Sequence, residues 1–248
     1  FTTNPISLQA QIDSIFRYSQ KWGLKINVGK TKVCVFEKRK QNFVINNEKL
    51  EIVDSFIYLG VKFTYTGNIS HAVKALHDQA LRAYHNLLSL FDKIHFDIKT
   101  KLSLFDKMIV PILLYGSEVW GIYNNTSFKS VDKLHMKFCK TILGVKQQTP
   151  NNAVLGELGR FPLSVIARER SLKYWLKIMK NTDKPTYKMY NDLCQQVQSN
   201  CWAKRINSFI DHLGFNNVRL QFNRTINYFP MFQRRVRDQF LKEWRENL

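Results

Sequence analysis

The chain has 248 residues, of which 44% are hydrophobic and 13% aromatic, so it can bury a sizeable core and is not a disordered polypeptide. It carries 38 lysines and arginines against 19 aspartates and glutamates, which gives a formal net charge of +19. A charge of this size favours a polyanionic partner, with nucleic acid as the first candidate and a membrane surface as the second.

The sequence contains no segment that predicts secretion or membrane insertion. Its longest apolar run, Met108 to Tyr115, is far too short to span a bilayer. The four cysteines show no close pairing, which favours free thiols and an intracellular location, nuclear or cytoplasmic. Cys194 and Cys201 are spaced more widely than is usual for zinc ligands, so we expect no metal site. Because the first residue is Phe1 and not Met, we expect residues 1–248 to be part of a longer protein.

The first part of the chain predicts one helix followed by a small antiparallel sheet. Apolar residues at helical spacing predict a helix over 7–22, which Gly23 is suited to end. Asn46 and Asn47 are suited to a hairpin turn between two of the strands that follow. Alternating apolar residues predict those strands over 31–36, 42–46, 50–53 and 56–63.

From residue 69 onward the pattern is helical. Pro111 should kink or restart one of the helices, and the polar stretch 181–200, which contains Pro185, predicts a linker. The fold class expected for the whole chain is therefore α+β, with a small antiparallel sheet followed by a mainly helical region. Helical spacing predicts helices over 69–91, 101–120, 127–143, 164–180, 202–213 and 232–244.

Basic residues gather on one face of two of these helices. In the helix over 69–91, Lys74 and Arg82 lie opposite the apolar stripe. In the helix over 127–143, four cations in one narrow stripe with no acid among them favour contact with phosphates, although a solvated helix face can have the same composition. These four are Lys129, Lys133, Lys137 and Lys140.

The order of three motifs resembles that of the non-LTR (LINE-type) retrotransposon reverse transcriptases. The motifs are "WGLKINVGKTKVCVF" at 22–36, "FIYLGVKF" at 56–63 and "MIVPILLYGSEVWG" at 108–121. The resemblance extends from Phe1 to about Lys180 and becomes faint beyond it. It implies the end of a polymerase palm with a primer-grip-like hairpin at 1–66, a helical thumb-like region at 67–125, a basic helical extension at 126–180, and a linker with C-terminal helices at 181–248.

The resemblance also implies roles for particular residues. Tyr58, Leu59 and Gly60 match the primer grip, where Gly60 would let a nucleic-acid strand approach the backbone closely. Lys30 matches a turn that lies near the leaving pyrophosphate, which a lysine could neutralise or protonate. The alternatives are a solvated turn lysine at position 30 and a core strand residue at Tyr58.

Nucleotidyl transfer of this type uses two metal ions held by carboxylates. The resembling family supplies an adjacent pair of aspartates for this purpose, whereas this chain has no adjacent acidic pair. Because Phe1 to Thr3 are similar to the strand that follows the pair, we expect the chain to begin just downstream of the catalytic aspartates. It should then hold no cofactor itself, and Mg²⁺ would be needed only by the complete parent enzyme.

The sequence therefore predicts a fragment of an RNA-directed DNA polymerase that grips primer–template without polymerising alone. Its partners would be an RNA template, a DNA primer or their hybrid, and not a membrane. One alternative is a non-catalytic remnant that binds nucleic acid. Another is a helical protein-interaction module, whose charge serves only to keep it soluble.

Overall fold

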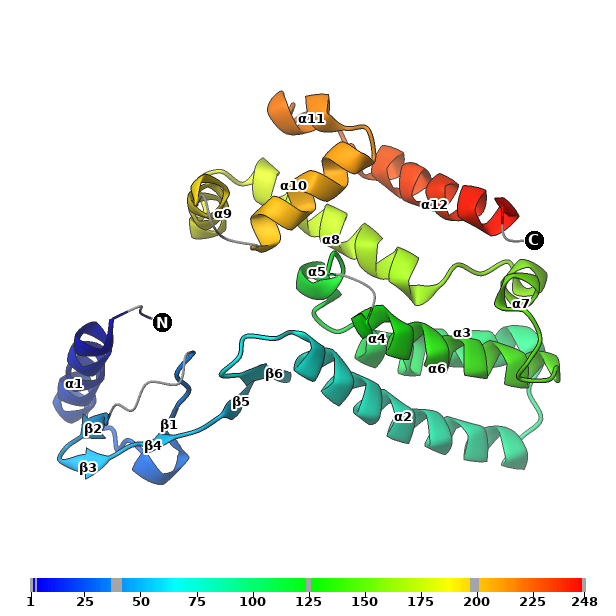
Figure 1. The fold of residues 1–248 in the computed structure, drawn as a ribbon. Helices are drawn as coiled ribbons and strands as arrows, with labels where there is room; N and C mark the ends of the chain where they lie inside the picture. Colours follow the sequence, from blue (N-terminus) through cyan, green and yellow to red (C-terminus); the bar gives the residue numbers. More distant parts are fainter. Residues whose placement is uncertain (1, 3, 37–41, 124–125, 197–200, 247–248) are drawn as a thin grey trace. The chain divides into compact units, whose positions relative to one another are not determined.

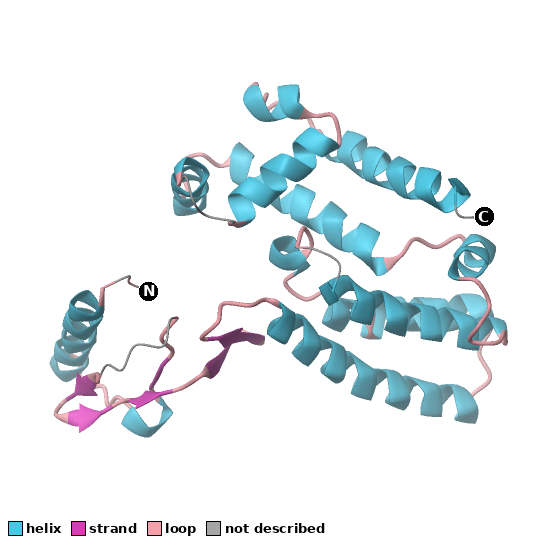
Figure 2. Cartoon of the chain, in the orientation of Figure 1, coloured by secondary structure: helices cyan, strands magenta, loops and turns pink. Residues whose placement is uncertain are grey.

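The computed structural model describes residues 2, 4–36, 42–123, 126–196 and 201–246, and it divides the chain into two units, residues 1–75 and 76–248 (Figure 1). Short strands occur only in the first part of the described chain and helices dominate the remainder, as Figure 2 shows. The expected α+β fold class is confirmed. Phe1 and Thr3, which we expected in a strand, lie outside the described residues.

The first unit begins with helix α1, Pro5–Lys21, which Asn4 caps by accepting a hydrogen bond from the Ile6 backbone N–H. Gly23 follows the helix with a φ of 64°, as predicted for its C-terminal end. A short 3₁₀ turn, Val28–Lys30, then leads into the strands. The strands are β1 (Lys32–Val33), β2 (Val44–Ile45), β3 (Glu48–Lys49), β4 (Glu51–Ile52), β5 (Ser55–Tyr58) and β6 (Val61–Thr64).

The strands of the described chain form separate two-stranded pairs, where a single antiparallel sheet was expected. The β2–β3 hairpin turns at Asn46 and Asn47, both at positive φ, which confirms the prediction for these asparagines. The β1–β4 pair is parallel, so the antiparallel prediction is wrong there. The segment 56–63 is not one continuous strand, because Leu59 and Gly60 turn the chain between β5 and β6.

The core of the first unit lies between α1 and the short strands. The side chain of Gln9 ties the helix to β2: its Nε2 donates to the Val44 carbonyl at 2.8 Å, and its Oε1 accepts from the Val44 N–H at 3.1 Å. Both hydrogen-bonding groups of Val44 are thereby satisfied by a helix side chain. The buried residues are Val33, Phe43, Ile45 and Leu50, with Leu8, Ile12 and Phe16 of α1 packed against them.

Among the described residues of the second unit, all regular elements are helices, and the division between the units falls within α2. Pro111 lies in the first turn of α4, where its missing N–H is not needed, so it restarts the helix as expected. Pro185 begins α9 in the same way, and the linker expected over 181–200 is therefore wrong for 185–195, which are helical. The helices are α2 (Ser70–Lys93), α3 (Ile98–Met108), α4 (Val110–Leu113), α5 (Ser117–Trp120), α6 (Thr126–Leu143), α7 (Asn151–Leu158), α8 (Leu163–Lys180), α9 (Pro185–Gln195), α10 (Trp202–His212), α11 (Asn216–Leu220) and α12 (Phe229–Glu246).

The motif at 108–121 packs α5 directly against α8. Gly121 has no space for a side chain, because a Cβ there would lie 2.3 Å from the carbonyl oxygen of Ala167. The Ser171 hydroxyl donates to the Ser117 carbonyl at 2.9 Å, which holds the two helices together. Gly121 therefore serves the close packing of two helices.

Aromatic side chains connect the later helices of the second unit. Trp175 of α8 is fully buried, and its Nε1 donates to the Tyr190 hydroxyl of α9 at 3.0 Å. That hydroxyl donates in turn to the Asn207 side chain of α10. Between α3 and α6, the rings of Phe105 and Phe138 stack with their centroids 3.9 Å apart. These contacts fix the positions of α6 and α8, which carry most of the basic site described next.

Candidate nucleic-acid interface

Helix α6 presents lysines on the side opposite its core residues. Val131, Leu134 and Phe138 are buried, as the periodicity predicts, and Gly144 follows the end of the helix at a φ of 67°. Lys129, Lys133 and Lys137 are exposed, and we call these three the α6 basic surface. Consecutive lysines are four residues apart, which places them in one row along the helix.

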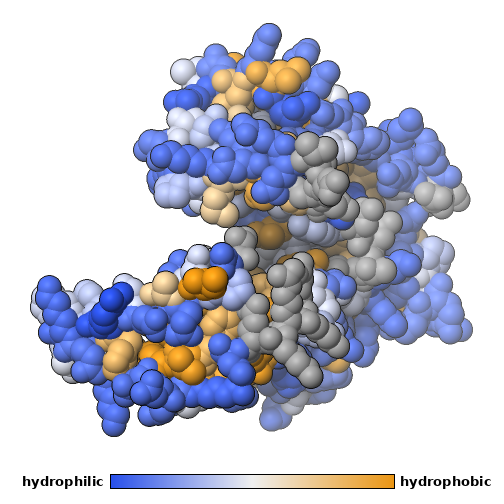
Figure 3. Space-filling view, turned by 60° about the vertical axis from the view of Figure 1, so that its left-hand side comes forward, coloured by the Kyte–Doolittle hydropathy of each residue, from blue (hydrophilic) through white to orange (hydrophobic). Residues whose placement is uncertain are grey.

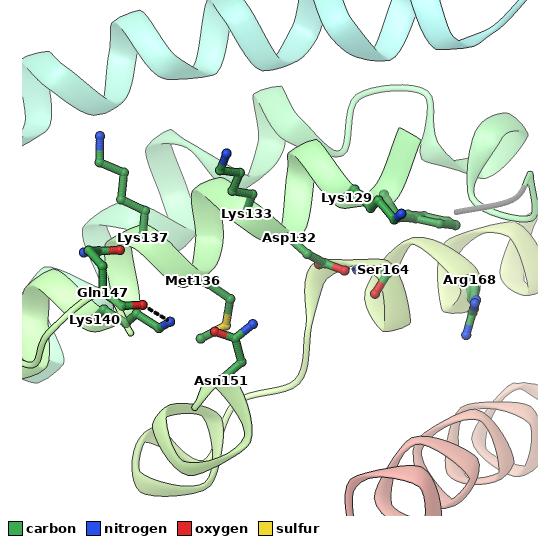
Figure 4. Close-up of a pocket in the computed structure, with 11 residues that line it drawn as sticks. Lys129, Asp132, Lys133, Met136, Lys137, Lys140, Gln147, Asn151, Ser164 and Arg168 are labelled. Carbon is green, nitrogen blue, oxygen red and sulfur yellow. Dashed lines mark hydrogen bonds between the residues drawn. The ribbon is translucent and has the colours of Figure 1, made fainter. Parts of the chain in front are cut away.

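Lys140 does not share the exposure of the other three, which corrects the expected four-lysine stripe. Its side chain is only 7% exposed, and its Nζ donates to the backbone carbonyl of Gln147 at 2.8 Å. Figure 4 shows Lys140 directed toward Gln147, which follows Gly144 in the connection between α6 and α7. The periodicity of α6 cannot reveal this burial, because a segment outside the helix causes it.

A cavity of about 670 Å³ lies between α6, α7 with its preceding connection, and α8 (Figure 4). Figure 4 shows that Met136, Asn151 and Lys140 gather at one end of it, and that Asp132 and Ser164 meet toward the other. Five of its lining side chains are cationic and one is a carboxylate. The lining residues are Phe128, Lys129, Asp132, Lys133, Met136, Lys137, Lys140, Gln147, Asn151, Ser164 and Arg168.

Asp132 is the single carboxylate among the described residues that line the cavity, and its role is to cap helix α8. Its Oδ1 accepts a hydrogen bond from the Ser164 backbone N–H at 3.0 Å. Pro162, which precedes α8, offers no side-chain cap, so Asp132 of α6 caps α8 in its place. Burial raises the pKa of this carboxyl group, while the hydrogen bonds from Ser164 act in the opposite direction.

Arg168 is a cation of the cavity that the sequence reasoning missed. Its guanidinium carbon lies 5.7 Å from the ring centre of Phe128 and 5.9 Å from that of Phe209, so it is close enough to both rings for cation–π contact. It follows Ser164 by one helical turn, and this spacing places both residues on the side of α8 that lines the cavity. The spacing was visible in the sequence, but the side of α8 that faces α6 was not.

The structure places Lys74 and Arg82 on the exposed side of α2, opposite the buried Leu76 and Ala80. Both positions agree with the predicted polar face of the helix. Neither residue lines the cavity at α6. Lys137 is the member of the α6 basic surface that reaches α2, with its Nζ 5.7 Å from the ring centre of Tyr84.

The predicted grip residues form the tip of the β5–β6 hairpin. Tyr58 ends β5, and Leu59 and Gly60 form the two-residue turn with φ values of 48° and 78°. Leu59 is 72% exposed, and a leucine in the left-handed region is uncommon because its side chain crowds the backbone. Figure 3 shows hydrophobic surface exposed among hydrophilic atoms, and more than half of the large exposed hydrophobic side chains of the described chain belong to the first unit.

Lys30 ends the 3₁₀ turn between α1 and β1 and is exposed. The Asn27 side chain accepts a hydrogen bond from the Lys30 backbone N–H at 3.0 Å, and the Thr31 hydroxyl donates to the Asn27 carbonyl at 2.9 Å. These contacts explain the choice of Asn27 and Thr31, since they close the turn. Lys32 is turned toward Glu51 on the parallel neighbour β4 and forms an ion pair with it.

A buried polar network lies on another side of α6. His135 is fully buried, and its Nε2 accepts from Arg160 Nε at 3.1 Å, while Arg160 Nη1 donates to Asp106 at 3.0 Å. Burial, with the nearby positive charge of Arg160, lowers the pKa of His135 to about 3. Burial likewise raises the pKa of the neighbouring Cys139 thiol to about 11. His135 is therefore neutral and Cys139 protonated at neutral pH, as expected for buried side chains of a packed core.

Within the described ranges, no three histidine, cysteine, aspartate or glutamate side chains are arranged to hold a metal ion. None of the helices in the same ranges combines the length and hydrophobicity that crossing a bilayer requires.

Comparison with known proteins finds distant relatives among mobile elements. Over 147 residues, 57% of this chain, it is 27% identical to a Caenorhabditis elegans protein described as transposon-derived. It is 24% identical over 149 residues to the RNA-directed DNA polymerase from mobile element jockey of Drosophila melanogaster, and 25% identical over 145 residues to that of Drosophila funebris. The match spans 52% of the nematode protein but only 15% and 16% of the two polymerases. No family model and no solved structure matches the chain.

Proposed function

We propose that residues 1–248 are a nucleic-acid-binding segment from the C-terminal part of an RNA-directed DNA polymerase of the non-LTR retrotransposon type. The distant similarity to the jockey polymerases supports the class of parent protein. The observation that carries the binding function is the row of exposed lysines on α6 beside a cavity that holds two further cations, Lys140 and Arg168. Such a row suits the evenly spaced phosphates of a nucleic-acid backbone.

Other contacts belong to the same proposal. The tip of the β5–β6 hairpin, Tyr58 to Gly60, would touch the primer strand, and Lys74 and Arg82 would add phosphate contacts along α2. In the complete parent, Lys30 would lie on the pyrophosphate side of the active site, and Mg²⁺ would be held by carboxylates outside this chain. The chain itself would bind primer–template and would not extend it.

The binding surface can be tested by removing its charges without disturbing the core. In the test variant, Lys129, Lys133 and Lys137 are all changed to Gln. In the control variant, the exposed Lys177, Lys180 and Lys188 are changed to Gln, which removes the same charge elsewhere in the second unit. Affinity for an RNA–DNA hybrid duplex is measured at several salt concentrations, and circular dichroism shows whether each variant is folded.

We expect the test variant to bind every duplex sequence more weakly, because phosphate contacts carry no base information. The slope of log affinity against log salt should flatten by about 0.9 for each lost contact. The control variant should keep a slope close to that of the original chain. Equal losses in both variants would mean that only net charge matters, and unchanged binding in a folded test variant would mean that the binding surface lies elsewhere on the chain. An original chain that binds no nucleic acid would favour the protein-interaction alternative.

A further inference from the structure

The end of the cavity at Lys140 contains a buried positive charge that the described chain does not neutralise. The ammonium group can donate three hydrogen bonds. Among the described residues, the acceptor that it reaches is the Gln147 carbonyl oxygen, and none of their carboxylates lies within ion-pair distance of it. Because an uncompensated buried charge is unfavourable, this arrangement is suited to an anionic group supplied by a ligand.

The surfaces beside Lys140 are suited to more than an anion. Met136, one turn before Lys140 on α6, is 8% exposed and offers a polarisable thioether. Asn151, at the start of α7, is exposed and has a side-chain amide that can both donate and accept hydrogen bonds. Figure 4 shows the Asn151 amide beside the Met136 side chain, on the same side of α6 as Lys140. A cation, an apolar wall and an amide at one end of a cavity match the phosphate, the face of the base and the polar edge of the base in a nucleotide.

We propose that this cavity binds one unstacked nucleotide of a single strand, with its phosphate at Lys140, its base against Met136 and the edge of the base at Asn151. The cavity volume of about 670 Å³ lies within the range of about 300–1,000 Å³ that is typical of small-molecule sites. A base that is paired and stacked in a duplex cannot enter such a cavity, whereas an unpaired one can. The proposal rests on the proposed function and specifies that this site takes a single strand.

The chain contains its own reporter for the test, because Met136 lines the site and the protein has only five methionines. The complete chain is labelled with ¹³C in the methionine methyl groups, and the Met136 signal is assigned by its loss in Met136→Leu. This substitution keeps the side-chain volume and should leave the fold intact. The ligands are adenosine 5′-monophosphate, adenosine and inorganic phosphate, each titrated separately.

We expect the nucleotide to shift the Met136 signal in a saturable way, because the base lies against the methyl group. Adenosine and inorganic phosphate should each bind at least about tenfold more weakly than the nucleotide, since each lacks part of the recognised group. Asn151→Ala should weaken nucleotide binding about three- to tenfold, and the exposed neighbour substitution Gln148→Ala should leave it unchanged. Lys140→Met, which keeps the aliphatic stem, should weaken it at least about tenfold.

Three results would overturn the proposal. The first is a Met136 signal that does not respond to millimolar nucleotide. The second is inorganic phosphate that binds as tightly as the nucleotide, which would make the cavity an anion site only. The third is equal binding by Asn151→Ala and the original chain. In each case, duplex binding that still depends on the α6 basic surface would show that the proposed function stands without the nucleotide site. If duplex binding also failed to depend on this surface, the proposed function and the nucleotide site would both be wrong.

Discussion

His135 shows how one buried side chain can make the stability of this protein depend on pH. The histidine accepts a hydrogen bond from Arg160 and is fully enclosed, so its protonated form is strongly disfavoured in the folded chain. Its folded pKa of about 3 lies below the value of about 6.5 expected for an unfolded chain. The unfolded chain therefore binds the proton more readily, and acid favours unfolding.

We predict that this contribution is complete above about pH 6.5 and is lost progressively as pH falls toward 3. Lowering the pH from 7 to 5 should reduce the free energy of unfolding by about 2 kcal/mol through His135 alone. Urea unfolding at both pH values measures the loss. In His135→Gln the amide oxygen can still accept from Arg160 but does not titrate, so the loss should be smaller by that amount. An equal loss in both proteins would contradict the assignment.

Leu59 is a second residue whose conformation has a measurable consequence. A left-handed backbone at a leucine costs about 1–2 kcal/mol, and an asparagine at the same place tolerates it far better. We predict that Leu59→Asn, which creates an Asn-Gly turn, slows amide hydrogen exchange in the β5–β6 pair. Leu59→Ala keeps the backbone strain and should give no such gain, so a similar effect of both changes would count against the prediction. If the exposed leucine contacts nucleic acid, the Asn variant should bind more weakly although it is more stable.

At the scale of the elements, the capping of α8 by Asp132 couples two helices that are separate in the sequence. We predict that Asp132→Ala lowers the free energy of unfolding by about 1 kcal/mol, since the Ser164 N–H loses its acceptor. Asp132→Asn keeps an oxygen at this place and should lose much less. Chemical denaturation of the two variants measures the difference. If both lose the same stability, the charge of Asp132 and not its cap is what supports α8.

The elements also show what the sequence can and cannot predict. The faces of α2, α6 and α8 follow from local periodicity, because a helix that packs on a core needs apolar residues at that spacing. The burial of Lys140 could not be predicted, since the connection after Gly144 covers it. Arg168 was missed because the rotation of α8 toward α6 is set by tertiary packing, including the contact at Gly121. Sequence reasoning therefore found the row of lysines and not the cavity beside it.

At the scale of the whole molecule, the α6 basic surface and the cavity both belong to the second unit, which has a core of its own. We predict that residues 67–248, which keep α2 intact, fold alone and unfold cooperatively. Their binding to an RNA–DNA hybrid should still depend on Lys129, Lys133 and Lys137. Thermal unfolding and the salt titration check both parts. A truncated chain that fails to fold, or one whose binding no longer responds to these lysines, would contradict the prediction.

The β5–β6 hairpin has a consequence for the behaviour of the first unit in solution. A two-stranded pair leaves backbone N–H and C=O groups unpaired along its outer edges, and here the exposed side chains of β5 include Phe56, Ile57 and Tyr58. Short uncharged segments with strong β-propensity are those that assemble into stacked strands between molecules. Lys62, opposite Ile57, is the charged residue of this pair, and its charge opposes such assembly. Repulsion between the many cations of the chain opposes it as well. Conditions that screen charge, such as concentrated salt, should therefore promote self-association through this edge while they weaken the binding of nucleic acid.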